Sequence, residues 1–74
     1  MPGLPNCTGR EAVRALERLG YTIVRQSGSH VRLKCPGRTP LTVPVHHGRD
    51  LAPGTLREII RKSGFTVEEF RDAL

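Results

Sequence analysis

The chain has 74 residues, a length that gives one domain with a thin core and little room for a buried pocket, so any catalysis takes place at the surface. Hydrophobic residues make up 36% and charged residues 26% of the sequence, which is typical of a soluble globular domain and not of a disordered tail. With one Tyr, two Phe and no Trp, the composition argues against a platform of several aromatics that stack on nucleobases.

The formal charge of +5 is concentrated in the middle of the chain. Residues 1–20 carry a net charge of +1 and residues 50–74 a net charge of −1, whereas residues 21–49 contain no Asp or Glu. This acid-free segment holds five cations, which are Arg25, Arg32, Lys34, Arg38 and Arg49. It indicates a surface that binds a polyanion such as nucleic acid. A preference for arginine codons would explain the ratio of Arg to Lys but not the missing acids.

The two cysteines, Cys7 and Cys35, form neither a CxxC pair nor a framework of short spacings, so we expect reduced thiols. The first residues lack the basic stretch and the long apolar run of a signal peptide. No apolar stretch of the sequence is long enough to span a bilayer. We therefore expect a cytoplasmic protein with no membrane partner.

Residues 1–7 contain two prolines and a glycine, and we expect them to form a loose arm. The first helix is predicted to begin after Thr8, because Thr8 and Glu11 have the spacing of a capping box. Apolar residues then recur at helical spacing as far as Leu19. Gly20 is suited to the left-handed conformation that follows a helix end.

Three strands are predicted in the middle of the chain. The first covers residues 21–26 and is rich in strand formers, although its buried face is ambiguous. A tight connection over residues 27–29 leads into the second strand, which starts near His30. The third covers residues 41–45 and contains Pro44, which cannot donate to a ladder, so we expect an edge strand.

The second strand alternates between apolar and polar residues. Side chains along a strand point to opposite faces with a period of two. The pattern predicts a buried face with Val31, Leu33 and Cys35, and an exposed face with His30, Arg32 and Lys34.

A second helix is predicted from Pro53 to Gly64, with Leu51 and Leu56 as a hydrophobic staple, and a short third helix follows a capping box at Thr66. The sequence thus predicts an α+β fold over a single domain, residues 1–74. Its order is α-β-β-β-α with a short C-terminal helix, and two helices cover one face of a three-stranded antiparallel sheet. The other face of the sheet stays open.

Metal chemistry is not indicated by the three histidines and two cysteines. His46 and His47 are adjacent and point in divergent directions, and no pair has the spacing of a zinc motif. Cys35 is expected on the buried face, where a thiol is an inert small hydrophobe. We therefore expect no metal ion and no cofactor.

Among the reactions considered, proton transfer to RNA needs the fewest protein groups on a shallow surface, because RNA carries its own nucleophile, the 2′-hydroxyl. An enzyme need only take that proton, stabilise charge on the phosphate and help the leaving oxygen to depart. His30 is the candidate base, and Arg32 and Lys34 oppose the charge that builds on the phosphate. Either His46 or water would protonate the leaving oxygen.

Three motifs and a final glycine occur in a specific order: Gly28-Ser29-His30, Val43-Pro44-Val45-His46, Pro53-Gly54-Thr55-Leu56 and Gly64. In this set the sequence resembles the HicA (YcfA-like) toxins, from about Thr8 to Phe70. The resemblance implies a fold similar to the double-stranded RNA-binding domain and an mRNA interferase activity, that is, an endoribonuclease that cleaves mRNA. It also implies a HicB antitoxin that covers the RNA-binding face.

By this resemblance the catalytic histidine of the family falls on His30, and Gly28 and Ser29 shape the turn around it. The second histidine of the pattern falls on His46, whose role stays open. Together with the cations of the strands, the residues expected to bind RNA are Gly28, Ser29, Arg32, Lys34, Arg25 and His46.

Two other functions fit the same sequence. One is a non-catalytic RNA-binding module of the same fold, which holds structured RNA by its shape and its phosphates. The other is an interaction protein whose basic face serves only an acidic partner. In both cases His30 would be a solvated residue at the end of a hairpin.

Overall fold

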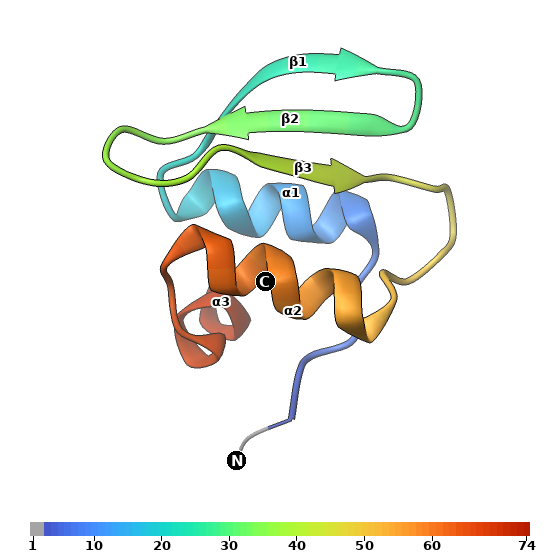
Figure 1. The fold of residues 1–74 in the computed structure, drawn as a ribbon. Coiled ribbons are helices and arrows are strands. Elements are labelled where there is room, and N and C mark those ends of the chain that lie inside the picture. The colour runs from blue at the N-terminus through green and yellow to red at the C-terminus, as the bar shows by residue number, and fades with distance from the viewer. Residues whose placement is uncertain (1–2) are drawn as a thin grey trace.

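Three helices and one three-stranded sheet make up the computed structural model, which describes residues 3–74. Along the chain the elements are (Figure 1) α1 (Gly9–Arg18), β1 (Thr22–Ser27), β2 (His30–Lys34), β3 (Leu41–Pro44), α2 (Pro53–Ser63) and α3 (Val67–Ala73). The strands are antiparallel and lie in the order β1-β2-β3. The α+β class and the predicted order of elements are confirmed.

Local sequence signals set the ends of the helices. At the start of α1, the Glu11 N–H donates to the Thr8 hydroxyl at 3.1 Å and the Glu11 carboxylate accepts from the Thr8 N–H at 2.8 Å. Thr66 and Glu69 form the same reciprocal pair at the start of α3. Gly64 ends α2 with a φ of +81°, in the left-handed region that favours glycine. Both predicted capping boxes are therefore present.

The core lies between the sheet and the helices. Val31 and Leu33 of β2 are buried, and they lie opposite Val43 and Leu41 of β3, so the two strands turn these side chains to one face. The helices cover that face, because α1 contacts β1 and β3, and α2 contacts β3, while α3 packs on α1. The largest buried side chains of the helices are Leu16, Leu56, Ile59, Ile60 and Phe70.

β3 is an edge strand, as Pro44 predicts. The Val45 N–H donates to the Ser29 carbonyl at 2.6 Å, which continues the register in which His30 lies opposite Pro44. In an antiparallel ladder, successive residues turn their backbone groups alternately toward and away from the neighbouring strand. The nitrogen of Pro44 therefore faces away from β2, where its missing N–H removes no ladder hydrogen bond.

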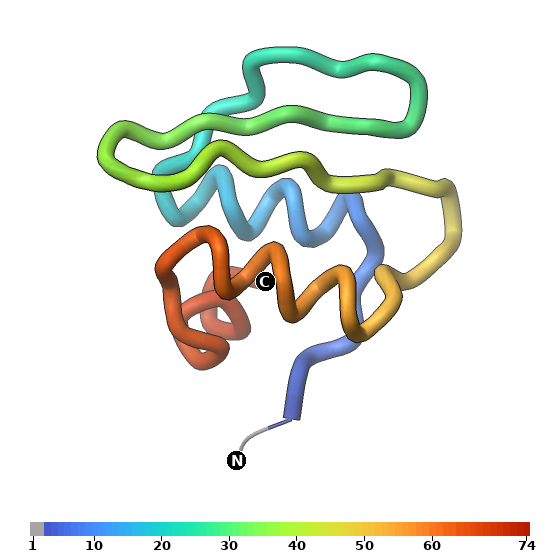
Figure 2. The backbone as a smooth tube through the Cα atoms, in the orientation of Figure 1, coloured from blue at the N-terminus to red at the C-terminus, as the bar shows by residue number. Residues whose placement is uncertain are grey.

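The N-terminal arm differs from the loose segment predicted for residues 1–7. Residues 1 and 2 lie outside the described part, but from Gly3 onward the arm is tied to the domain. The Leu51 N–H donates to the Cys7 carbonyl at 2.8 Å, and the Arg71 guanidinium donates to the Gly3 carbonyl at 2.8 Å. Figure 2 shows the arm running past the start of α2. The apolar side chains of Leu4 and Cys7 pack on the core, which explains the difference.

Cys35 is half-buried, whereas the alternation of the second strand predicts a buried thiol. The reason is that β2 ends at Lys34, so Cys35 already belongs to the turn before β3. Within residues 3–74 there is no helix with the length and apolar character needed to cross a membrane.

Candidate functional site

The face of the sheet opposite the helices carries the cations predicted for it. On β2, His30, Arg32 and Lys34 are exposed and alternate with the two buried residues of the strand. Arg25 of β1 lies directly opposite Arg32, and it too is exposed. We call the surface made by Arg25, His30, Arg32 and Lys34 the basic face.

A bulge in β1 brings Arg25 to this face. Ile23 lies opposite Leu33, on the side of the helices, and Arg25 would share that side if the strand were regular. The register shifts between Ile23 and Arg25, so that Val24 is the extra residue and Arg25 lies opposite Arg32. This shift resolves the ambiguity that the sequence leaves for the first strand.

His30 begins β2 directly after the turn that joins β1 and β2. Gly28 has a φ of +57°, a backbone conformation that residues other than glycine rarely adopt. Ser29 is half-buried and its carbonyl accepts the Val45 N–H, so its backbone anchors the start of β2 to the end of β3. His30 lies between Ser27 on one side and Pro44 on the other. Both neighbours are uncharged, and His30 is exposed to solvent.

His46 lies beyond the end of β3 and is exposed. It lines a hollow of about 310 Å³ together with Thr8, Arg10 and His47. The structure thus places His46 past the strand that neighbours His30, near the start of α1, and not on the strand face itself.

A groove of about 490 Å³ continues from the basic face across the edge of β3 to α2. Arg32 and Thr42 line it from the sheet, and the Arg32 guanidinium donates to the Thr42 hydroxyl at 3.3 Å. Thr55 and Lys62 line it from α2. Thr42, Thr55 and Lys62 are not among the site residues predicted from the sequence, although the spacing of seven residues puts the last two on one face of a helix and would have suggested them.

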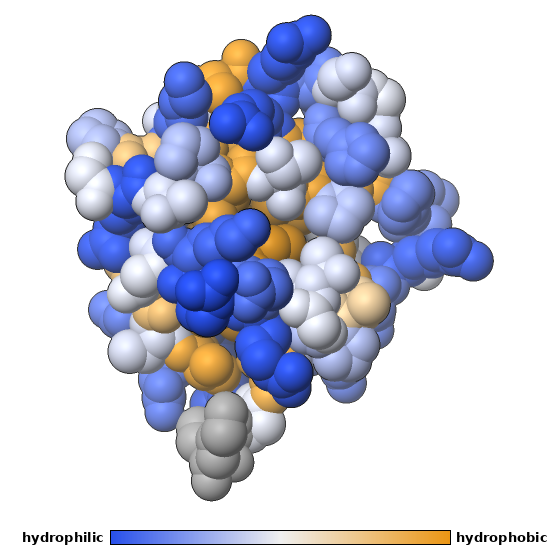
Figure 3. All heavy atoms as spheres, in the orientation of Figure 1, coloured by the Kyte–Doolittle hydropathy of each residue, from blue (hydrophilic) through white to orange (hydrophobic). Residues whose placement is uncertain are grey.

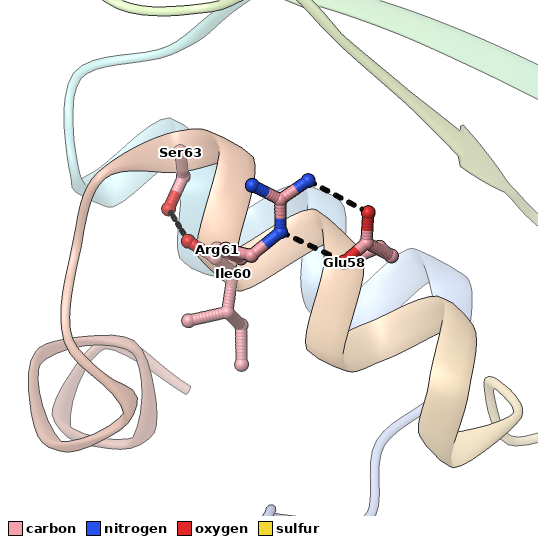
Figure 4. Close-up of polar contacts among 4 residues, drawn as sticks. All are labelled: Glu58, Ile60, Arg61 and Ser63. Carbon is pink, nitrogen blue, oxygen red and sulfur yellow. Dashed lines mark hydrogen bonds and ion pairs between the residues drawn. The ribbon is translucent and has the colours of Figure 1, made fainter.

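Glu58 also lines this groove, and Arg61 neutralises it. The Arg61 guanidinium donates to both carboxylate oxygens at 2.8 Å, as Figure 4 shows. This hydrogen bonding lowers the pKa of Glu58 below its ordinary value. The groove therefore combines a paired carboxylate with the positive charges of Arg32 and Lys62.

Arg38 belongs to the acid-free segment, but its side chain makes contacts that stabilise the fold. Its guanidinium donates to the Ser63 carbonyl at 2.9 Å and lies 3.7 Å from the centre of the Phe65 ring. It joins the turn between β2 and β3 to the end of α2. The net charge of the segment therefore overstates the number of cations on the basic face.

The arrangement is a shallow, solvent-open surface with one imidazole among three cations. Such a surface can hold phosphate groups and can move a proton at an atom placed beside the imidazole. Among the described residues, no three His, Cys, Asp or Glu side chains gather as a possible metal site.

The family model described as HicA toxin of bacterial toxin-antitoxin matches residues 9–65, which is most of the chain. A search of curated proteins finds no match. The matched range begins with the first residue of α1 and includes the whole sheet, the basic face and α2. The chain therefore belongs to the HicA family, the toxins of bacterial toxin–antitoxin systems, and this membership implies an antitoxin partner.

Proposed function

We propose that this toxin is an mRNA interferase, a metal-independent endoribonuclease that cleaves RNA on its basic face in the cytoplasm. A HicB-like antitoxin neutralises it. Family membership supports the toxin role, and the observation that carries the enzymatic part is the position of one exposed histidine among Arg25, Arg32 and Lys34.

The basic face binds the phosphates of the RNA. Its cations project from neighbouring β-strands, so they can contact successive phosphates of a single-stranded RNA that lies across the sheet. Residues 21–49 contain no carboxylate that would repel this backbone. The groove beyond β3, with Arg32 and Lys62, continues the positive surface toward α2.

His30 acts as the general base. Its imidazole takes the proton of the RNA 2′-hydroxyl, and the 2′-oxygen attacks the adjacent phosphorus. The bond from phosphorus to the 5′-oxygen breaks, and that oxygen takes a proton from water or from His46. The products are a 2′,3′-cyclic phosphate and a 5′-hydroxyl. Arg32 and Lys34 stabilise the negative charge that develops on the phosphate.

A short RNA with one 2′-O-methyl group at the cleaved linkage tests this chemistry. The unmodified RNA is cut in the presence of a chelator and leaves a cyclic phosphate, because the nucleophile belongs to the substrate. The methylated linkage, which lacks the proton that His30 removes, stays intact, while unmodified linkages in the same strand are still cut. Cleavage at the methylated linkage would mean that an external nucleophile attacks.

A non-catalytic RNA-binding module is the alternative, and the same experiment distinguishes the two. Such a module binds the unmodified and the methylated RNA and cuts neither.

A further inference from the structure

The two edges of the sheet differ in their capacity to accept a further strand. On β3 the backbone groups of Thr42 and Pro44 face away from β2, and Pro40 directly precedes the strand. Two of these three residues are prolines and have no N–H to offer. Prolines in such positions protect a sheet edge from pairing with another chain.

β1 contains no proline. The backbone N–H and carbonyl groups of Val31 point toward β3. Those of Arg32 therefore point toward β1, where Arg32 pairs with Arg25. The alternation then turns the N–H and carbonyl groups of Ile23 and Gln26 outward, away from the sheet. The edge of β1 therefore offers free hydrogen-bonding groups to a fourth strand on either side of the bulge at Val24.

This edge also exposes apolar surface. All six residues of β1 are exposed, and Ile23 and Val24 keep 40% and 51% of their surface accessible. In the space-filling view, apolar atoms reach the surface at the top, where Figure 1 places β1 (Figure 3). An exposed apolar edge strand favours association with another chain.

The surroundings of β1 determine which side chains such a strand would carry. On the helix side lies a hollow of about 190 Å³ between α1 and β1. Four apolar side chains, two cations, one carboxylate and one amide line it: Val13, Ile23, Val31, Val45, Arg10, Arg14, Glu17 and Gln26. On the other side, Arg25 begins the basic face. Residues that lie opposite one another on paired strands share a face of the sheet.

We propose that the antitoxin binds the edge of β1 with an extended segment in which apolar residues alternate with Asp or Glu. The apolar side chains lie opposite Ile23 and Gln26 and fill the hollow, and the acidic ones lie beside Arg25 on the basic face. A second copy of this chain fits less well, because two acid-free segments would then bring their arginines together. The inference rests on the proposed neutralisation by an antitoxin and is independent of the cleavage chemistry.

Amide hydrogen exchange of the labelled chain tests the binding mode, with the purified protein encoded by the adjacent reading frame as the partner. In the free chain the outward amides of Ile23 and Gln26 exchange fast, and in the complex they slow by about tenfold or more. The Thr42 amide, which faces outward on the opposite edge, is the internal control and stays fast. Slowed exchange at Thr42 in place of Ile23 and Gln26 would overturn the inference. So would slowed exchange of the free chain at high concentration, which would identify a second copy as the occupant.

A matched pair of variants separates this inference from the proposed function. Ile23→Lys places a charge on the edge of β1, and Leu74→Lys changes a residue of similar exposure, 42%, at the end of α3. Ile23→Lys weakens antitoxin binding by about tenfold or more and leaves RNA cleavage by the free chain unchanged, while Leu74→Lys changes neither. Equal antitoxin affinity of both variants and the wild type would overturn the inference. Absence of RNA cleavage by the wild type would overturn only the proposed function.

Discussion

Cys7 combines deep burial with acidic neighbours. Its side chain is 2% exposed and packs in the core. Burial raises the pKa of the thiol from 9.0 to about 11, and the carboxylates of Glu11 and Asp50 act in the same direction. The folded chain therefore keeps this proton to a higher pH than the unfolded chain does.

The free energy of unfolding should decrease between about pH 9 and about pH 11, because the unfolded chain releases the Cys7 proton in this range and the folded chain keeps it. Below this range both states hold the proton, and the contribution of Cys7 is complete. Urea unfolding under reducing conditions at about pH 8 and about pH 10.5 measures the effect. The stability difference between the wild type and Cys7→Ala should shrink at the higher pH. A Cys7 difference that is equal at both pH values contradicts the raised pKa.

Single residues were predictable from sequence where their immediate neighbours determine their position. The alternation around His30 predicts the exposed face of β2, and the structure confirms it. Arg25 was expected to bind RNA, but its face could not be predicted, because it depends on the bulge at Val24. A bulge is a property of two paired strands, so the sequence of one strand does not reveal it.

The helix α1 begins in close contact with the end of β3. A Cβ added at Gly9 would overlap the Pro44 carbonyl oxygen and lie 2.9 Å from the Val45 Cα. Glycine at this position lets the first turn of α1 lie against the segment that leads to His46.

Gly9→Ala should destabilise the domain by about 1 to 3 kcal/mol, because backbone atoms must move to admit the methyl group. In a domain of this size, that lowers the melting temperature by at least about 4 °C. Gly54→Ala is the matched control, since Gly54 also lies in the first turn of a helix and an added Cβ meets no atom of the described residues within 4 Å. It should leave the melting temperature unchanged or raise it slightly. Equal melting temperatures of the two variants would show that α1 can shift away from β3 at little cost.

The ends of the helices can be predicted from local signals in the sequence, whereas the contacts between elements cannot. The capping boxes at Thr8 and Thr66 and the glycine after α2 act over three or four residues, so the sequence alone predicts them. The groove between β3 and α2 joins residues far apart in the chain, such as Thr42 and Lys62. The ordering of the N-terminal arm likewise depends on Leu51, a distant residue.

The negative charges of the molecule all lie outside its sheet. The acid-free segment contains all three strands of the sheet, whereas α2 and α3 contain both signs of charge. A surface of one sign steers a polyanion to one side of the molecule. The absence of acids from residues 21–49 predicts this distribution from the sequence, although the Arg38 guanidinium binds the Ser63 carbonyl at the end of α2 and does not join the basic face.

Lys34→Glu should weaken RNA binding and reduce the dependence of affinity on salt. Each phosphate contact that is lost lowers the slope of log affinity against log salt by about 0.7 for a single strand. Arg57→Glu is the matched control, because it changes the net charge equally on the exposed surface of α2. Titrations at several salt concentrations should show a smaller slope for Lys34→Glu and the wild-type slope for Arg57→Glu. Equal slopes of the two variants would mean that net charge, and not the basic face, holds the RNA.

A single-turnover measurement of RNA cleavage tests the proposed ribonuclease activity. It compares the rates of the wild type and of His30→Ala, each with and without a chelator. His30 is exposed at the start of β2, so its replacement should leave the fold and the RNA affinity nearly unchanged. We expect His30→Ala to lose about 10² to 10⁴ in the cleavage rate, the usual contribution of a general base, and the chelator to have no effect on the wild type. A His30→Ala variant that cleaves as fast as the wild type, or a wild type that the chelator inactivates, would contradict this expectation.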